Sequence, residues 1–308
     1  MQVLFVCSGN KSNNKPGVVV QNQANSLIHK GIDIDFYIIN NKGFFGYLKA
    51  IKPLIKKINR QSYTVIHAHY SLSGYVAGVA KIFARKKPKL ITSLMGSDTQ
   101  GSKGKMILIQ LFNRCFWNET IIKSSSMSKN FTKSSYKIIP NGVDMESINK
   151  KLKKEQRENY ILFPADPNRV SKNYDLAQQA INHLGAGYEM KTVYNRPHTE
   201  IIEHLKKCAC VLLTSKWEGS PNVIKEALAC NTPIVSTKVG DIEKLIKGLD
   251  GCFLSEMNVE SISESIKKAI DFSIKKGDTN GRQRLFELNL TAERVANQII
   301  QLYEQQED

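Results

Sequence analysis

Residues 209–237, ACVLLTSKWEGSPNVIKEALACNTPIVST, contain one complete strand–helix–strand unit. The unit opens with the apolar run 209–214 and closes with a second run at 233–237, and short apolar runs bounded by turn residues predict buried strands. The segment 221–230 between them has helical spacing. Two strands joined through a helix predict a parallel pair. The stretch therefore predicts an α/β fold built on a parallel sheet.

The same alternation of strands and helices continues along the whole chain and falls into two runs. We expect two Rossmann-like, doubly wound α/β domains that face each other across a cleft, spanning 1–143 and 159–289. The polar stretch 144–158 is expected to be a linker, and the helical pattern at 290–308 to pack back on the first domain. Ligands of such sheets bind at the carboxyl ends of the strands, so we expect the functional site there.

The composition is that of an ordinary globular protein. Apolar residues make up 41% and charged residues 23% of 308 residues, which argues against disorder. No apolar run approaches the roughly 18 residues that a membrane span requires. Residues 2–7 are too short and lack the basic flank of a signal peptide. The six cysteines form no Cys-x-x-Cys pair, so we expect reduced thiols in a cytoplasmic protein.

The net positive charge of the protein comes entirely from the first half of the chain. Residues 1–150 contain 22 Lys and Arg against 6 Asp and Glu, whereas residues 151–308 contain 22 of each kind. Such a one-sided field attracts nucleic acid, an anionic membrane or phosphorylated ligands, although a basic surface without any partner is the alternative. No nucleic-acid-binding motif is present, so we expect no nucleic-acid partner.

The segment 44–60, FFGYLKAIKPLIKKINR, combines apolar and aromatic residues with five basic residues and no acidic one. A basic amphipathic helix of this kind suits the surface of an anionic membrane, which predicts a peripheral protein on the inner face of the cell membrane. The alternative is a helix that packs its apolar face on its own sheet and turns its basic face to water.

The loop and helix start at 214–226 form a candidate anion site. Ser220 suits the N-cap of the helix and Pro221 its first position, where the missing N–H of proline costs nothing. The free amides around Ser220 and Asn222 and the helix dipole favour a diphosphate at this helix start. On the helix, the Glu226 carboxylate is placed to accept hydrogen bonds from vicinal ribose hydroxyls. Glu218 on the loop is placed to reach a sugar. The alternative is that both carboxylates are merely solvated.

Glu218 and Glu226 are separated by seven residues, and EGSPNVIKEALACNTPIVST resembles the Glu-x7-Glu signature of the retaining family 4 glycosyltransferases of the GT-B fold. The likeness extends to four further segments: HAHYSLSG at 67–74, MGSD at 95–98, IPNGVD at 139–144 and FPADPNRVSKNYDLAQ at 163–178. It implies transfer of a sugar from a nucleotide-sugar donor with retention at the anomeric carbon. It also implies that Glu226 holds the donor ribose, that Glu218 contacts the transferred sugar, and that domain 1–143 binds the acceptor.

Arg169 and Lys172 lie in the segment that resembles the family's diphosphate-binding stretch. Cations fixed beside the departing diphosphate stabilise the transition state more than the ground state. Arg169 stands three residues before Lys172, whereas the family's Arg usually stands five residues before its Lys. Lys172 therefore matches the family's diphosphate-binding pattern better than Arg169 does. With these cations and a helix dipole beside the diphosphate, we expect neither a metal nor a separate cofactor in the chemistry.

Several positions depart from the family pattern. Met95 stands where a His is common, and we expect Asp98 or the backbone to replace it on the sugar side. YNRP at 194–197 replaces a Gly-rich turn, and Gly17 ends the loop 9–17 that replaces a Gly-Gly loop, where its amide would approach phosphate. We expect His67 and His69 to face opposite sides of the sheet, with His67 in the core and His69 toward the cleft.

The sequence thus predicts a retaining, metal-independent hexosyltransferase that extends a glycan or a lipid-linked acceptor in surface polysaccharide synthesis. In the mechanism commonly described for the family, the leaving phosphate takes the acceptor proton on one face of the sugar. One alternative is a GT-B nucleotide-sugar epimerase, which needs no acceptor. Another is a non-enzymatic basic module that binds membrane or nucleic acid. A dinucleotide dehydrogenase is excluded, because no Gly-x-Gly-x-x-Gly follows the first strand.

Overall fold

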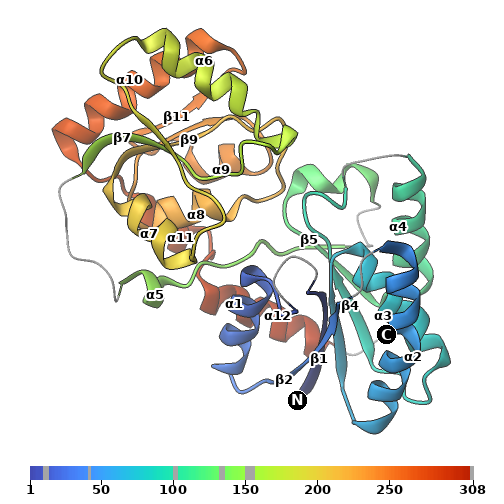
Figure 1. Cartoon of the computed structure of the whole chain (residues 1–308). Helices are drawn as coiled ribbons and strands as arrows, with labels where there is room; N and C mark the ends of the chain where they lie inside the picture. Colours follow the sequence, from blue (N-terminus) through green and yellow to red (C-terminus); the bar gives the residue numbers. More distant parts are fainter. Residues whose placement is uncertain (10–13, 41–42, 100–102, 132–135, 150–156, 306–308) are drawn as a thin grey trace. The chain divides into compact units, whose positions relative to one another are not determined.

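The computed structural model describes residues 1–9, 14–40, 43–99, 103–131, 136–149 and 157–305. The chain divides into two compact units (Figure 1). The first unit combines residues 1–142 with 292–308, and the second comprises residues 143–291. Each unit is a parallel sheet with helices on both faces, which confirms the predicted pair of doubly wound α/β domains.

The first unit is built on a six-stranded parallel sheet. Its strands, in spatial order, are β2 (Asp33–Ile39), β1 (Gln2–Ser8), β3 (Val65–His69), β4 (Lys89–Ser93), β5 (Glu119–Ile122) and β6 (Lys137–Ile138). Central strands of such a sheet are buried on both faces and therefore read as continuous apolar runs. In β1, residues 3–6 have no solvent exposure at all.

Alternate residues of each strand supply two separate cores. Val3 and Phe5 of β1 pack with α1 (Val18–Ile28) and α12 (Ala292–Glu304), whereas Leu4 and Val6 pack on the opposite face. That second face is covered by α2 (Gly43–Arg60), α3 (Ser71–Phe83) and α4 (Lys103–Cys115). A short 3₁₀ helix, η1 (Ser125–Asn130), follows β5.

Helix α12 belongs to the first unit although it comes last in the sequence. Val295, Ile299 and Tyr303 are buried in the same core as Phe5, and α12 packs beside α1. The Tyr303 hydroxyl lies 2.6 Å from Nδ1 of His67 on β3. The chain therefore leaves the first unit after residue 142 and returns to it at residue 292.

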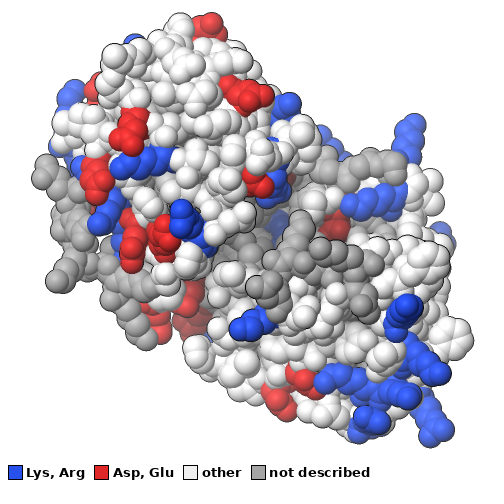
Figure 2. Space-filling model, in the orientation of Figure 1, with Lys and Arg blue, Asp and Glu red and all other residues white. Residues whose placement is uncertain are grey.

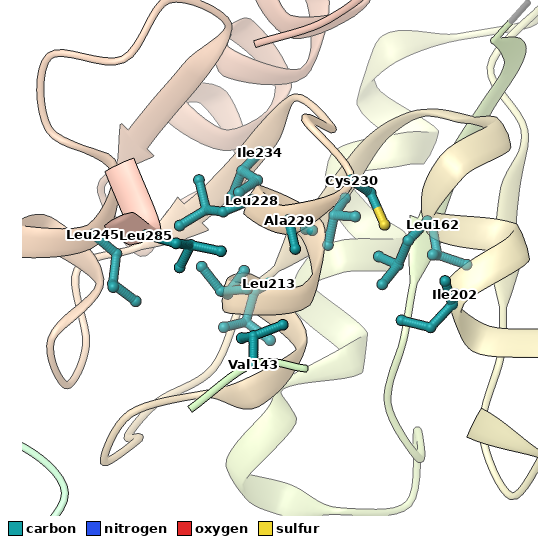
Figure 3. Close-up of a cluster of buried hydrophobic side chains, with 14 of the residues drawn as sticks. Val143, Leu162, Ile202, Leu213, Leu228, Ala229, Cys230, Ile234, Leu245 and Leu285 are labelled. Atoms are coloured by element: carbon teal, nitrogen blue, oxygen red, sulfur yellow. The ribbon is translucent and has the colours of Figure 1, made fainter. Parts of the chain in front are cut away.

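The second unit is built on a five-stranded parallel sheet. Its strands, in spatial order, are β11 (Cys252–Ser255), β10 (Ile234–Thr237), β9 (Cys208–Leu213), β7 (Glu158–Phe163) and β8 (Met190–Thr192). One face is covered by α6 (Tyr174–Leu184) and α10 (Val259–Lys276). The other face is covered by α5 (Met145–Asn149), α7 (His198–Lys207), α8 (Asn222–Ala229), α9 (Ile242–Ile246) and α11 (Gly281–Glu287), and Figure 3 shows part of this core.

The stretch predicted as a linker contains part of the second core. Met145 and Ile148 are buried among the helices of the second unit. Val143, the last residue of the predicted first domain, also belongs to this core and forms a β-bridge with Thr291. The polar composition of 144–158 concealed these widely spaced apolar residues, which are too few to predict α5. Residues 150–156 of the predicted linker lie outside the described part of the chain. None of the described helices is long and apolar enough to cross a bilayer.

A single arginine joins three helices at the amino edge of the second sheet. The Arg157 guanidinium, whose side chain is 7% exposed, donates to carbonyls at or just past the ends of α7, α8 and α10. The acceptors are Leu205, Lys206 and Cys208, Cys230 and Asn231, and Gly277, at 3.0–3.3 Å, and the Asp278 carboxylate lies at 2.9 Å. Carbonyls at helix ends lack intrahelical donors and carry partial negative charge, so a fork of N–H groups satisfies them.

We predict that Arg157→Ala lowers the free energy of unfolding by about 3–5 kcal/mol, because it leaves several buried carbonyls and part of a charge pair without a partner. The measurement is urea unfolding followed by circular dichroism. Arg196→Ala, at a side chain that is 63% exposed, is the matched control and should change stability by no more than about 0.5 kcal/mol. Equal midpoints for the two variants would contradict the role given to Arg157.

Candidate active site

The order of strands in the second sheet marks where a ligand site is expected. From β7 the chain moves to β8 on one side and then to β9 on the other side. The carboxyl ends of β7 and β9 therefore flank a topological switch point, where the loops diverge and leave room for a ligand. Lys172 lies in the loop after β7, in the 3₁₀ helix η3 (Val170–Lys172), and Glu218 lies in the loop after β9.

Lys172 and Glu218 form an ion pair at this switch point. The Lys172 Nζ donates to Glu218 Oε1 at 2.5 Å, and the side chains are only 11% and 16% exposed. The Ser215 hydroxyl donates to the same carboxylate oxygen at 2.8 Å. A carboxylate that accepts from two donors is held in one orientation, and low exposure strengthens both bonds. The structure thus brings together two residues that the sequence placed in separate motifs.

Backbone and hydroxyl contacts hold the two loops against each other. The Thr214 hydroxyl donates to the carbonyls of Lys172 and Asn173, both at 3.0 Å, and the Lys216 amide donates to the Ser171 carbonyl at 2.8 Å. Sequence reasoning missed Thr214 and Ser215. Their only signal in the sequence was that two hydroxyl residues directly follow an apolar strand.

The two predicted cations differ in their surroundings. Lys172 is buried, whereas Arg169 is an exposed residue at the start of η3. Asn173 follows in the left-handed conformation, with a φ of 54°, and is the N-cap of α6. The structure therefore brings Lys172, rather than Arg169, into contact with Glu218.

Glu226 pairs with a histidine that the sequence analysis did not select. Its Oε1 lies 2.9 Å from Nε2 of His198, the first residue of α7, and the side chains are 17% and 31% exposed. Helix α8 begins one residue later than expected, with Pro221 at the N-cap and Asn222 as the first helical residue. Ser220 therefore precedes the N-cap and does not cap the helix.

A buried lysine within α8 and a partly buried aspartate at the N-cap of α9 influence each other's charge. Burial lowers the pKa of the fully buried Lys225 to about 8, although Asp241 and Glu226 oppose the shift. Burial also raises the pKa of Asp241, against the effects of the Ser220 hydroxyl and of Lys225. Gly240 next to Asp241 has a φ of 61°, and a Cβ there would lie 2.3 Å from the Gly219 carbonyl oxygen. Only glycine allows these two loops to approach so closely.

The first unit has its own switch point, between β1 and β3. Gly17 occupies the N-cap of α1, and a Cβ built there would meet no atom within 4 Å. Crowding within the chain therefore does not require glycine at this position. Residues 10–13 of the loop that precedes Gly17 lie outside the described part of the chain.

The expectation that His67 and His69 face opposite sides of the sheet is wrong. Residues two apart on a strand share a face, and the two rings stack with centroids 4.5 Å apart. His67 bonds Tyr303 and, through Nε2 at 2.8 Å, the Ser93 hydroxyl. His69 has no solvent exposure, and burial together with Lys123 lowers its pKa to about 3. Both rings therefore belong to the core and are neutral at physiological pH.

Asp98 is engaged in joining two loops at the carboxyl edge of the first sheet. Its Oδ1 accepts from the Ser71 hydroxyl at 2.6 Å and from the Ser71 amide at 3.2 Å, and its Oδ2 accepts from the Met95 amide at 2.8 Å. It is 5% exposed. Between the loops, Tyr70 has a φ of 71°, which is costly for a residue with a side chain. Asp98 thus holds a strained turn at the start of α3.

The Asp-x-Asp pair Asp33 and Asp35 lies away from these loops. It stands at the beginning of β2, at the amino edge of the sheet, and Asp35 bonds Lys57 at 2.6 Å and the Tyr63 hydroxyl. Across the described residues, no three His, Cys, Asp or Glu side chains gather in a metal-binding arrangement.

Two family models match the chain, and together they span most of it. The model described as "Glycosyl transferases group 1" matches residues 145–284, and "Glycosyl transferase 4-like" matches residues 13–126. An uncharacterized glycosyltransferase of Methanocaldococcus jannaschii is 25% identical over 289 residues, covering 85% of this chain and 77% of the relative. The UDP-Gal:alpha-D-GlcNAc-diphosphoundecaprenol alpha-1,3-galactosyltransferase of Escherichia coli is 22% identical, covering 73% and 70%.

Solved structures share the fold along nearly the whole chain. Anabaena HepE in complex with UDP and glucose has a TM-score of 0.74 and 16% identity, covering 98% of this chain and 99% of HepE. The sucrose-phosphate synthase of Thermosynechococcus elongatus has a TM-score of 0.73 and 15% identity, covering 98% of both chains. At these identities the likeness establishes the arrangement of strands and helices within the two domains.

We predict that Lys225 makes stability depend on pH. Its pKa falls from 10.5 to about 8 on folding, so between these values the unfolded state binds more protons. Stability should therefore rise with pH across that window, by at most about 1.4 kcal/mol per pH unit. Lys225→Met should abolish this increment, which urea unfolding of both proteins at pH 8, 9 and 10 would measure. If the difference in unfolding free energy between the wild type and Lys225→Met were the same at pH 8, 9 and 10, the prediction would be refuted.

Proposed function

Because the chain belongs to the GT-B glycosyltransferases of the family 4 type, we propose that it is a retaining hexosyltransferase using a uridine diphosphate sugar. The proposed acceptor is a glycan or lipid-linked glycan of a surface polysaccharide, and the proposed reaction needs no metal ion. The observation that carries the proposal is the Lys172–Glu218 ion pair at the switch point of the second sheet. The uracil base of the proposed donor is suggested by HepE, whose structure contains UDP. The proposed acceptor is suggested by the Escherichia coli galactosyltransferase, whose acceptor, as its name states, is a sugar linked to a lipid diphosphate.

The proposed step exchanges one bond at the anomeric carbon for another on the same face of the sugar. The bond from that carbon to the diphosphate oxygen breaks, and a bond to the acceptor oxygen forms. The acceptor hydroxyl gives its proton to the departing phosphate oxygen, so atoms and charges balance without a separate base. The diphosphate gains negative charge during this step, and a fixed cation beside it lowers the barrier.

Lys172 is the residue proposed to supply that cation. In the free protein the Lys172 ammonium forms an ion pair with Glu218. It is therefore already oriented and partly desolvated. Arg169 and the amides at Ser220 and Asn222 near the start of α8 are proposed to add positive potential at the diphosphate. Glu218 is proposed to contact the transferred sugar and Glu226 the donor ribose.

We predict that the purified protein transfers hexose from a UDP-sugar to a polyprenyl-diphosphate-linked sugar, with retention, in the presence of excess EDTA. A thermal-shift panel of UDP-, GDP- and ADP-sugars selects the donor, and proton NMR of the product reports the anomeric configuration. Lys172→Ala should lower kcat more than it weakens donor binding, because the charge develops during transfer. Lys268→Ala, at an exposed lysine of α10, is the control that leaves kcat unchanged.

Three outcomes would contradict separate parts of this proposal. Release or isomerisation of the sugar without acceptor would indicate a nucleotide-sugar epimerase. Activity that EDTA removes and magnesium restores would refute metal independence. An inverted product would refute retention while leaving the family assignment unchanged.

We further propose that α2 binds the anionic inner surface of the cell membrane, which would make the enzyme a peripheral protein of the cytoplasmic face. Gly46, Ala50, Leu54 and Ile58 form a buried stripe, so α2 does pack on its own sheet. The remaining surface of α2 exposes Phe44 and Phe45, at 73% and 75%, and three lysines, Lys49, Lys52 and Lys56. Figure 2 shows basic side chains gathered over the region where Figure 1 places α2.

We predict that replacing Lys49, Lys52 and Lys56 by Glu weakens sedimentation with phosphatidylglycerol vesicles at least roughly a hundredfold, since each lysine contributes about 1 kcal/mol. Lys57 is left unchanged because it pairs with Asp35. Binding of the wild type should fall as salt is raised. The matched control replaces Lys267, Lys268 and Lys275 of α10 by Glu and should bind normally. Equal binding by both triple variants would leave α2 as a helix that only packs on its sheet.

A further inference from the structure

His198 directly follows the segment where the family resemblance leads one to expect a glycine-rich turn. The segment YNRP at 194–197 takes that place, and Asn195 adopts the left-handed conformation, with a φ of 53°, that a glycine would otherwise supply. Pro197 then occupies the N-cap of α7, and His198 is its first residue. The turn therefore places the His198 imidazole, at the start of α7, next to the Glu226 side chain on α8.

The direction of the hydrogen bond between the two side chains follows from their chemistry. An ionised carboxylate only accepts, so Nε2 of His198 carries the proton that is donated to Oε1 of Glu226 over 2.9 Å. Both the neutral Nε2–H tautomer and the imidazolium satisfy this requirement. Because the Glu226 side chain is only 17% exposed, water competes weakly for the bond.

A glutamate side chain has several rotatable bonds, and fixing them costs conformational entropy. The His198 imidazole holds Oε1 of Glu226 in the free protein. The side-chain entropy of Glu226 is therefore lost on folding and not on ligand binding. Oε2 and the second lone pair of Oε1 then remain as acceptors for hydroxyl groups. Vicinal ribose hydroxyls are spaced to donate to such a carboxylate.

We propose that His198 is a positioning residue for nucleotide binding, which holds the Glu226 carboxylate in the orientation that accepts both ribose hydroxyls. This inference rests on the proposed function, since it assumes a nucleotide donor. The alternative is a purely structural role, in which His198 only links α7 to α8. Loss of His198 would then weaken the binding of nucleotides with and without ribose hydroxyls by the same factor.

The test compares UDP with 2′,3′-dideoxy-UDP, which lacks both hydroxyls, by isothermal titration calorimetry. His198→Phe keeps the ring volume but removes the donor, and should weaken UDP binding roughly tenfold, or about 1.4 kcal/mol. It should leave binding of dideoxy-UDP unchanged. His198→Gln offers an amide donor at similar reach and should bind UDP within about threefold of the wild type. His183→Phe, at an exposed histidine of α6, is the matched control.

A double-mutant cycle separates positioning from general packing. In a Glu226→Ala background, His198→Phe should have no further effect on UDP binding, because the group that it positions is gone. Should His198→Phe fold poorly, His198→Ala serves in the same cycle. Additive losses, or equal weakening of UDP and dideoxy-UDP, would overturn the inference. Failure of the wild type to bind any of UDP, GDP, ADP and dTDP would instead overturn the proposed function.

Discussion

The Arg157 guanidinium, with its bonds to the ends of α7, α8 and α10, is the interaction on which the second unit depends most. Helices α7 and α8 are only ten and eight residues long, and each runs from the candidate site to this arginine. Such short helices are marginal by themselves and take their stability from tertiary contacts. Because one planar group fixes where both helices end, it also fixes where His198 and Glu226 stand relative to each other. Arg157 at the amino edge of the sheet thereby helps to position the His198–Glu226 pair of the candidate site.

The arrangement of strands was accessible from sequence because parallel strands buried on both faces leave a plain signal. The apolar run 209–214 contains most of β9, and the run 233–237 contains β10, with only α8 and its flanking loops between them. Weaker signals were lost. Helix α11 and the five-residue α5 carry too few apolar residues to show a helical period, and the burial of Met145 and Ile148 is decided by neighbours that are distant in sequence.

The candidate site was predictable in its residue types and less so in its contacts. Glu218, Glu226 and Lys172 stand in recognisable segments, but the pairing of Lys172 with Glu218 joins residues 46 positions apart through the strand order. Nothing in the local sequence of Ser215 or His198 indicates its partner, because each residue gains its role from a carboxylate that lies further along the chain. The prediction for His67 and His69 failed for another reason. The period of a strand is two residues, so their spacing predicts a shared face, and the observed stacking agrees with that rule.

The discontinuous first unit sets an order of events during synthesis. Residues 143–291 form a complete core of their own and emerge from the ribosome before α12 does. The first sheet, although made earliest, must wait with the α12 side of its core unfilled until Val295, Ile299 and Tyr303 have been translated. At typical rates of about 5–20 residues per second, the interval from residue 142 to residue 303 lasts roughly ten to thirty seconds. Until then the nascent first unit exposes the apolar face that α12 later covers, while residues 143–291 can already form their own core.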